Sequence, residues 1–525
     1  MENESVSERK SKLKKIFFSW VKDGYDKYFL AVLLFAFILR IWIFTKTLNQ
    51  PLWWDGADYM SAAKRIGLGL EIRDIWYYRR GFLFPLITAP FFALGAGETG
   101  IRLLEVLFST GFVLVSYLLM TRIVEKKVAI LASICLSMSW IMVFFSGRIL
   151  TDIPAAFFIV LSFLFFWDGY FLNKGNKYVY LSALIFAAAV LTRMQSLMML
   201  PVFFMIPFMK EKFGMFSNKK IWMGALIFAI AMLPQVFLYS SHYGNPIKDI
   251  GSHYLGIGEK AEQTGNARII SFAMFNYILD LPYMLTKWIF YLFLMGFVMF
   301  FADLFIGLDK IFKNEELQKK FFVLSFVLCL FLVMGYVGSV SYVEQRYVTA
   351  ALPFLFMISV FPLVKLGEYF EKNLKLSNTL SIICILVILF ILLVPNFTLG
   401  KTMIEEKKTS FIEVKEAGLW IKENSNTSDV VISGSLPQIV YYSERSTYPF
   451  DFWYKNAEFE NYSQNVTGFL QFVEDRKPKF MILSLYESLP DWAKTLPQDY
   501  PGKTVPVQVY RQGETPVLII YEFKY

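Results

Sequence analysis

Two carboxylates, Asp55 and Asp58, stand three residues apart in the segment PLWWDGADYM, just after the first long apolar run of the chain. A carboxylate beside a reacting hydroxyl can take its proton, so either aspartate could act as a general base. A third acid, Asp152, lies in SGRILTDIP before another apolar run. Because an Ile-Pro pair follows Asp152, a capping role at a helix start fits its position as well as catalysis does, and both can hold at once.

Three arginines have positions that suit a phosphate ligand. Arg148 precedes Asp152 in the same segment, while Arg193 lies in LTRMQ. Arg346 lies in SYVEQRY, before a late apolar run. This set of residues suits a reaction on a lipid-linked phosphate. The arginines can neutralise the phosphate, and a carboxylate can take a proton from an incoming hydroxyl. Structural roles also fit, since Arg148 could simply pair with Asp152, and the other two could anchor helix ends at a membrane surface.

Other residues of these segments are candidates for contact with the substrate: Trp54, Tyr59, His253, Glu344 and Tyr347. The tryptophans have an alternative, because Trp53 and Trp54 also suit an aromatic belt at a membrane interface.

A divalent metal is a second possibility for the acids. Asp55 and Asp152 offer the hard oxygen ligands that Mg²⁺ or Mn²⁺ prefers. His242 and His253 are the two histidines of the chain and share one loop. Two histidines eleven residues apart in a loop are more often ordinary loop residues than metal ligands. The sequence leaves metal dependence open.

The composition is that of a polytopic membrane protein. Of 525 residues, 56% are hydrophobic and 18% aromatic, with only 18% charged. A soluble protein could not bury this much apolar surface. The net charge of +9 comes from short clusters between apolar runs, which indicates topology signals rather than a nucleic-acid surface. The three cysteines all fall within apolar runs and cannot form a disulfide framework.

About eleven apolar runs have roughly the 20 residues that a membrane-spanning helix needs. They lie near 28–45, 101–121, 128–146, 153–171, 178–192, 195–209, 221–239, 283–306, 321–338, 347–364 and 379–395. The pair of runs on either side of Arg193 could instead form one bent, re-entrant element. No cleavage site follows the basic N-terminus, so we expect the first run to be retained as a signal-anchor helix.

Basic stretches orient this bundle, because positive loops stay on the cytoplasmic side. They alternate with the apolar runs at the N-terminus and at 122–127, 173–177, 210–220, 308–320 and 372–375. The segments 46–100, 240–282 and 339–346, and everything after Pro395, then lie outside. All the candidate residues fall on that outer side, at a rim where scarce ionisable groups suggest a site.

Glycosylation sequons give a second indication of orientation. Asn396, Asn426, Asn461 and Asn465 each begin an Asn-x-Ser/Thr motif in the last 130 residues. If they are used, this part of the chain is extracytoplasmic. Chance occurrence of the motif is an equal alternative.

The last part of the chain changes character. Residues 401–525 alternate apolar patterns such as DVVISG and PVLIIYEF with helical stretches such as SFIEVKEAGLWIKEN. We predict a cytoplasmic tail at 1–27, a transmembrane catalytic domain at 28–395 with an outer loop at 46–100, and a small α/β domain at 396–525.

The order of several motifs resembles that of the GT-C glycosyltransferases, especially the protein O-mannosyltransferases and the aminoarabinose transferase of lipid A. The matching stretches are WWDGADY, SGRILTDIPAAFF, LTR, YGNP and QRYVTAALP, spread over most of residues 46–360. Each motif is weak alone, whereas their order and their common side of the membrane are moderately specific.

The resemblance implies an inverting transfer of a sugar from a polyprenyl-phosphate donor, of the dolichyl-phosphate-mannose kind, to a protein, lipid or glycan hydroxyl. It places the base at Asp55, a second acid at Asp152, and phosphate-binding arginines at Arg193 and Arg346. The family often has Asp-Glu in the first loop, whereas here the second acid is displaced to Asp58, so which of the two is the base stays open. We expect an integral plasma-membrane protein of a prokaryotic cell, with its site extracytoplasmic.

A transporter or a flippase for lipid-linked sugars is the alternative from another class. It would need ionisable groups along a path through the bilayer, whereas this sequence keeps them at the outer rim. A structural scaffold with an outer recognition domain is a third interpretation, under which the rim carboxylates would be dispensable.

Overall fold

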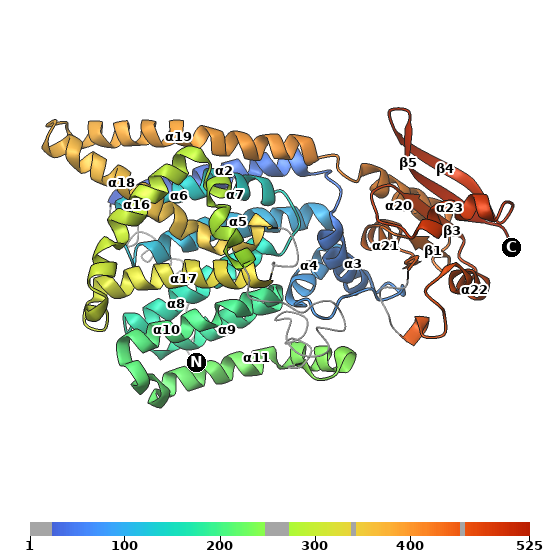
Figure 1. The fold of residues 1–525 in the computed structure, drawn as a ribbon, viewed down its shortest axis with the longest axis horizontal. Coiled ribbons are helices and arrows are strands. Elements are labelled where there is room, and N and C mark those ends of the chain that lie inside the picture. Colours follow the sequence, from blue (N-terminus) through green and yellow to red (C-terminus); the bar gives the residue numbers. More distant parts are fainter. Residues whose placement is uncertain (1–23, 247–271, 338–342, 452–456) are drawn as a thin grey trace, which may run out of the picture.

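A helical bundle and a smaller C-terminal α/β domain make up the computed structural model, which describes residues 24–246, 272–337, 343–451 and 457–525 (Figure 1). The C-terminal domain sits at one end of the bundle, called the domain end here. His253 and most of the predicted N-terminal tail lie outside the described residues.

The helices that form the bundle run roughly side by side along its length (Figure 1). They are α2 (Gly24–Thr47), α5 (Gly97–Met120), α6 (Lys126–Met138), α7 (Trp140–Phe145), α8 (Asp152–Phe166), α9 (Asn176–Thr192), α10 (Leu200–Glu211), α11 (Lys219–Tyr243), α16 (Lys287–Ile306), α17 (Glu315–Val337), α18 (Leu352–Lys372) and α19 (Asn378–Lys407). Shorter elements connect them: α3 (Trp54–Leu68), α4 (Leu83–Ala93), η1 (Trp167–Phe171), η2 (Met194–Met199), η3 (Lys212–Ser217), η4 (Phe272–Phe275), α14 (Asn276–Leu279), α15 (Leu281–Leu285), η5 (Leu308–Lys310) and η7 (Gln345–Ala351).

Each of the eleven predicted apolar runs falls on helical structure. Within the described part of the chain, eight helices are long and apolar enough to cross a membrane: α2, α5, α8 with η1, α11, α16, α17, α18 with η7, and α19. The other three runs are interrupted or shorter. The run 128–146 breaks between α6 and α7, 178–192 is the 17-residue α9, and 195–209 is divided between η2 and α10.

The break between α6 and α7 is held by a side chain from α19. Ser139 has φ −54° and ψ 133°, so it leaves the helix and frees the backbone N–H of Trp140. That N–H donates to Oδ1 of Asn396 at 2.7 Å, while Nδ2 of Asn396 donates to the carbonyl of Leu285 at 2.8 Å. Asn396 is fully buried. For Asn396 the structure therefore favours chance occurrence of the sequon over a glycan, because its amide is engaged inside the bundle.

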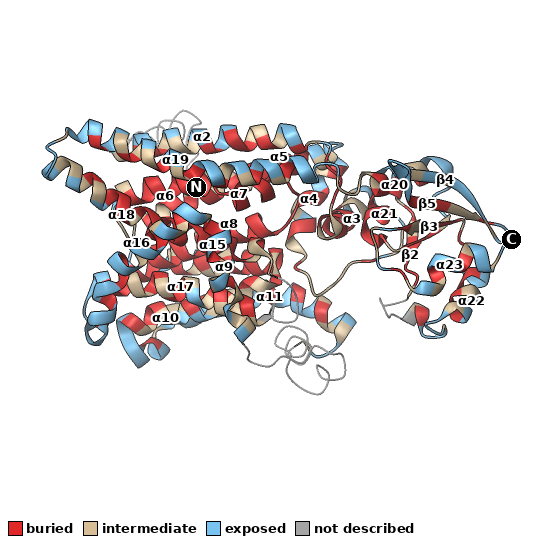
Figure 2. Cartoon of the chain, turned by 45° about the horizontal axis from the view of Figure 1, so that its top comes forward, coloured by how far each residue is buried: buried red, intermediate tan, exposed pale blue. Residues whose placement is uncertain are grey.

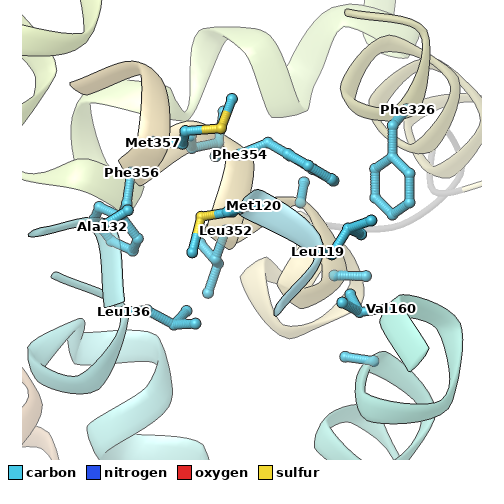
Figure 3. Packing of buried hydrophobic residues seen from close by; sticks show 14 of the residues in the cluster. Leu119, Met120, Ala132, Leu136, Val160, Phe326, Leu352, Phe354, Phe356 and Met357 are labelled. Carbon is cyan, nitrogen blue, oxygen red and sulfur yellow. The ribbon is translucent and has the colours of Figure 1, made fainter. Parts of the chain in front are cut away.

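Buried apolar side chains from several helices meet in the middle of the bundle (Figure 3). Leu119 and Met120 of α5 lie near Leu352 and Phe354 of α18, with Phe326 of α17 beside them. In α18 with η7, 89% of the most apolar stretch is buried, against 17% in α11. Because α11 is apolar but exposed on most of its surface (Figure 2), it fits a helix that faces lipid.

The C-terminal domain is built on a five-stranded sheet of order β2-β1-β3-β5-β4. Its strands are β1 (Val430–Ser433), β2 (Ser446–Tyr448), β3 (Phe480–Ser484), β4 (Thr504–Gln512) and β5 (Thr515–Phe523). Strands β1, β2 and β3 are parallel, whereas β5 is antiparallel to β3 and β4. The helices of the domain are α20 (Ile412–Asn424), α21 (Leu436–Ser443), α22 (Val466–Arg476) and α23 (Asp491–Asp499), with η8 (Ala457–Phe459). The predicted small α/β domain is confirmed.

Helix α21 joins this domain to the bundle by packing on α3. Lys64 of α3 pairs with Glu444 at 2.7 Å, directly after α21. The backbone N–H of Leu52 donates to the hydroxyl of Tyr442 at 2.9 Å. Residues 56–63 of α3 are buried as a result. Residues 59–80 are thus divided between this buried helix and the loop that follows it.

The loop after α3 forms a second attachment to the C-terminal domain. Arg73 pairs through Nε with Glu458 at 3.1 Å, and its Nη1 donates to the carbonyl of Thr447 at 3.3 Å. Its guanidinium lies 4.5 Å from the ring centroid of Tyr448, a cation–π contact. Contacts of both α3 and its following loop thus fix the C-terminal domain against the domain end of the bundle.

Candidate active site

Helix α3 presents the first two acids at the domain end. Asp55 lies in the first turn of α3, where the free backbone N–H groups favour a negative charge. Asp58 follows three residues later, so the two side chains project from one side of the helix. Asp55 has a side chain that is 30% exposed, whereas that of Asp58 is 3% exposed. Only the first of this pair is open to a substrate.

Arg80 holds both acids of α3. Its Nη2 lies 2.9 Å from Oδ1 of Asp55, and its Nε lies 3.1 Å from Oδ2 of Asp58. Its guanidinium also lies 5.1 Å from the ring centroid of Tyr59. Arg80 was not predicted as a site residue. Two acids this close together in the sequence indicate that a positively charged residue lies nearby. Nothing in the YYRR segment, however, identifies Arg80 as that residue.

Arg346 joins three carboxylates from different parts of the chain. Its Nη2 lies 2.9 Å from Asp55, and its Nε lies 3.2 Å from Glu344. Its Nη1 lies 3.5 Å from Asp152, at the start of α8. The Arg346 side chain is 8% exposed, so these ion pairs are largely shielded from water. Glu344, Arg346 and the two predicted acids Asp55 and Asp152 therefore form one network.

Arg193 extends the network on the far side of Asp152. Its Nη1 lies 3.2 Å from Oδ1 of Asp152 and donates to the hydroxyl of Thr151 at 3.3 Å. Its guanidinium lies 4.5 Å from the ring centroid of Tyr347. The break between α9 and η2 places Arg193 here, because this residue has extended backbone angles between two helices.

Two hollows meet at Arg346. A cavity of ≈ 630 Å³ opens between the bundle and the C-terminal domain, called the domain cavity here, and is lined by Trp53, Trp54, Asp55, Glu344, Arg346, Lys407, Ser410, Phe411, Tyr486 and Gln512. A smaller space of ≈ 20 Å³, called the bundle pocket, lies on the other side and is lined in part by Asp152, Arg193 and Tyr347. Leu330 and Met334 of α17 give the bundle pocket an apolar side.

The remaining predicted residues have different surroundings. Trp54 lines the domain cavity, whereas Tyr59 is buried and its hydroxyl accepts from Thr151 at 3.4 Å. Arg148 lies elsewhere. Its guanidinium stacks 3.4 Å from the ring centroid of Trp53 instead of pairing with Asp152, and it lines neither hollow. The alternative ion pair of Arg148 with Asp152 is therefore not seen, whereas its contact with a phosphate stays a prediction.

The two acids of α3 have opposite proton affinities. Burial alone would raise the pKa of Asp55, but the charges of Arg80 and Arg346 and their hydrogen bonds hold it well below its usual range. Burial raises the pKa of Asp58 to about 6, against the attraction of Arg80 and with added repulsion from Asp55. Asp55 is therefore ionised at neutral pH, and Asp58 titrates just below it.

Known proteins share this architecture. Residues 79–237 match the sequence family described as Dolichyl-phosphate-mannose-protein mannosyltransferase. ArnT from Cupriavidus metallidurans bound to undecaprenyl phosphate has a similar structure, with a TM-score of 0.59 and 12% identity over 95% of this chain and 98% of that chain. The oligosaccharyltransferase of Archaeoglobus fulgidus in the apo form gives a TM-score of 0.60 and 14% identity over 89% of this chain and 70% of that chain. The sequence matches no curated protein significantly.

The chain has the fold of ArnT and of the oligosaccharyltransferase. Part of it also matches the mannosyltransferase family, so the predicted resemblance to the GT-C glycosyltransferases is confirmed, as is the multispan helical fold with a C-terminal α/β domain.

The acids of this site do not fit a divalent metal. A further similar structure is the Archaeoglobus fulgidus oligosaccharyltransferase in complex with zinc and sulfate, at a TM-score of 0.54 and 13% identity over 86% of this chain and 68% of that chain. Here Asp55 and Asp152 both pair with Arg346, which stands between the two carboxylates proposed as ligands. No group of three or more His, Cys, Asp or Glu side chains suited to a metal occurs among the described residues.

Helix α11 positions Arg80 through one buried side chain. Nε2 of Gln235 donates to the carbonyls of Tyr78 at 2.9 Å and Arg80 at 3.2 Å, and its Oε1 accepts from the N–H of Phe82 at 3.3 Å. Gln235 is 2% exposed. These bonds fix the backbone on both sides of the arginine that holds both acids, so Gln235 is a positioning residue for the candidate site.

Replacing Gln235 with leucine is expected to lower kcat for sugar transfer about 10–100-fold, because Arg80 and the acids it holds would shift from their aligned positions. Unpaired carbonyls should also cost about 1–3 kcal/mol of stability. Steady-state kinetics and thermal unfolding of the purified enzyme measure both effects. Gln318→Leu is the control, since Gln318 is also buried but contacts Met209 at the other end of the bundle. An unchanged kcat in Gln235→Leu, with the control also unchanged, would contradict the positioning role.

Proposed function

We propose that the enzyme transfers a sugar from a polyprenyl phosphate to a hydroxyl of an acceptor that enters the domain cavity. The observation that carries this proposal is the place of Arg346, which lines both hollows and is paired with Asp55. A donor whose phosphate is bound at Arg346 could place its lipid chain against the apolar side of the bundle pocket. A hydroxyl in the domain cavity would face Asp55.

In this reaction the acceptor oxygen attacks the anomeric carbon of the donor sugar while Asp55 takes the hydroxyl proton. The bond between that carbon and the phosphate oxygen breaks, and the electron pair leaves with the polyprenyl phosphate. Arg346 and Arg193 stabilise the charge that develops on the departing phosphate. Attack from the side opposite the leaving group inverts the configuration of the sugar.

The geometry supports Asp55 over Asp58 as the base. Of the three predicted aspartates, Asp55 lines the domain cavity, Asp152 lines the bundle pocket, and Asp58 lines neither. A donor phosphate that attracts Arg346 would weaken its hold on Asp55 and so raise the proton affinity of that carboxylate. Binding of the donor would thereby make Asp55 a stronger base when the acceptor arrives.

We also propose that the domain end faces the extracytoplasmic side. The five described basic loops, at 122–127, 173–177, 210–220, 308–320 and 372–375, join helices at the end of the bundle away from the C-terminal domain. Arg122, Lys320 and Lys365, from separate helix ends, line one cavity there. The positive-inside rule assigns that end to the cytoplasm.

The test of the function uses the full chain in nanodiscs with undecaprenyl phosphate carrying radiolabelled mannose or 4-amino-4-deoxyarabinose. Label that moves to an acceptor, with release of undecaprenyl phosphate, supports the proposal. Movement of an intact labelled lipid across proteoliposomes, with no covalent product, would instead support a flippase.

The rate of transfer is expected to fall as the pH drops through about 6, following the pKa of Asp58. Protonation of Asp58 removes its charge from Arg80, which then pairs with Asp55 alone and makes that carboxylate a weaker base. A profile of kcat/KM between pH 4.5 and 8 measures the inflection. Asp58→Asn should lose it and show the lowered rate of the protonated enzyme at every pH, because asparagine removes the same charge from Arg80. The same inflection in Asp58→Asn would assign it to another group.

A further inference from the structure

The C-terminal domain supplies its own wall to the domain cavity. Phe411, Tyr486 and Gln512 line it opposite Trp54 and Asp55 of α3. They come from three places in the domain: the residue before α20, the loop after β3, and the end of β4. None of the three was predicted as a site residue, and the reaction proposed above assigns them no role.

Glu413 fixes the polar part of this wall. The hydroxyl of Tyr486 donates to Oε2 of Glu413 at 2.7 Å, and Nε2 of Gln512 donates to Oε1 at 2.9 Å. The same Nε2 contacts the Tyr486 hydroxyl at 2.8 Å. Glu413 is 6% exposed, whereas Gln512 is exposed. The amide nitrogen is thus held by the domain, and the amide oxygen of Gln512 has no hydrogen-bond partner among the described residues.

Aromatic rings complete the wall. The rings of Phe411 and Tyr486 pack edge to face at 5.6 Å between centroids. Phe411 has φ +66°, a left-handed conformation that is costly for a residue with a side chain. Strain of this kind persists where the surrounding structure enforces it and is frequent at ligand sites. Here it accompanies an aromatic side chain at the edge of the domain cavity.

This combination suits a saccharide. Aromatic faces pack against the apolar C–H faces of a sugar ring, and a fixed amide oxygen accepts from ring hydroxyls. Lys407 and Ser410 add donors on the same side. The domain cavity, at ≈ 630 Å³, is within the usual size of a small-molecule site, and its groups converge on the space in front of Asp55.

We propose that the wall of Phe411, Tyr486 and Gln512 binds the acceptor and that the acceptor is a saccharide, with Gln512 accepting from one of its hydroxyls. This inference rests on the proposed function, because only that reaction makes the bound saccharide an acceptor. Binding of a saccharide to the wall can nevertheless be measured without transfer, so the two proposals can fail separately.

The experiment measures binding of the full-length protein in nanodiscs to an array of immobilised oligosaccharides and to an array of Ser/Thr-containing peptides, without donor. The variants are Gln512→Leu, which removes the amide, and Tyr486→Phe, which removes only the hydroxyl. Gln508→Leu is the matched control, because it makes the same substitution on β4 at a residue that does not line the cavity. Thermal unfolding verifies that each variant is folded.

Wild-type protein and Gln508→Leu are expected to retain a subset of the oligosaccharides, with binding weakened at least 10-fold in Gln512→Leu. Tyr486→Phe should show an intermediate loss, because Gln512 keeps Glu413 as its anchor. Undiminished saccharide binding in Gln512→Leu overturns the inference, as does retention of peptides alone by the wild type or the absence of any saccharide binding. Saccharide binding without sugar transfer in the wild type would support the wall and contradict the proposed reaction.

Discussion

Asp55→Asn is expected to lower kcat for sugar transfer by about 10²–10⁴-fold, the range that a positioned general base contributes. Asparagine keeps the shape of the side chain but cannot take the acceptor proton. The neighbouring arginines retain other partners, since Arg80 also pairs with Asp58 and Arg346 also pairs with Asp152 and Glu344. Unfolding temperature should therefore change little, and the KM for the donor should change less than kcat. Steady-state transfer from a labelled polyprenyl-phosphate sugar measures the effect.

Asp303→Asn is the matched control, because Asp303 is also an ion-paired carboxylate, with Lys320 at 2.6 Å, but lies at the opposite end of the bundle. It should leave transfer unchanged. A large loss in Asp58→Asn at pH 7.5, with activity preserved in Asp55→Asn, would assign the base to Asp58. Full activity in both variants would remove the proposed base altogether.

Arg346→Ala is expected to abolish transfer and also to destabilise the protein. Truncation leaves Asp55, Asp152 and Glu344 without the guanidinium that they share. Breaking a buried ion pair by removing one partner typically costs about 3–5 kcal/mol, and the donor phosphate loses a main contact at the same time. Thermal unfolding in detergent measures the first effect, and transfer of labelled sugar measures the second.

A second substitution separates the two roles of Arg346. Asp152→Asn in the Arg346→Ala background removes one uncompensated charge and should restore part of the stability without restoring transfer. Arg346→Lys should remain folded but have a raised KM for the donor, because an ammonium cannot make the forked contacts of a guanidinium. Recovery of activity together with stability in the double variant would mean that Arg346 has only a structural role.

The length of the apolar runs and the positions of the charged residues between them were sufficient to predict the bundle. A run such as 379–395 is long and apolar without a competing pattern, and α19 contains it. The sequence did not show that this helix continues to Lys407, because residues 401–407 are mostly polar and lie beyond the apolar length that spans a membrane. The burial of Asn396 was equally hidden, since it depends on the break at Ser139, far away in the chain.

Parts of the site were accessible because acids and arginines stand out against apolar helices. Asp55, Asp152, Arg193 and Arg346 were predicted individually, and the structure brings them into contact. Arg148 was not distinguishable from them, since its stacking on Trp53 depends on how two helix ends meet. The wall formed by Tyr486 and Gln512 could not be predicted, because these common residues become a site only when the C-terminal domain docks on α3.

That docking has a consequence for biosynthesis. The helix that carries Asp55 and Asp58 emerges early from the ribosome, but α21, which packs against it, is translated only after all the bundle helices. A nascent chain can therefore insert its spans before α21 covers α3. The wall of Phe411, Tyr486 and Gln512 joins the domain cavity last, because these residues follow every bundle helix in the sequence.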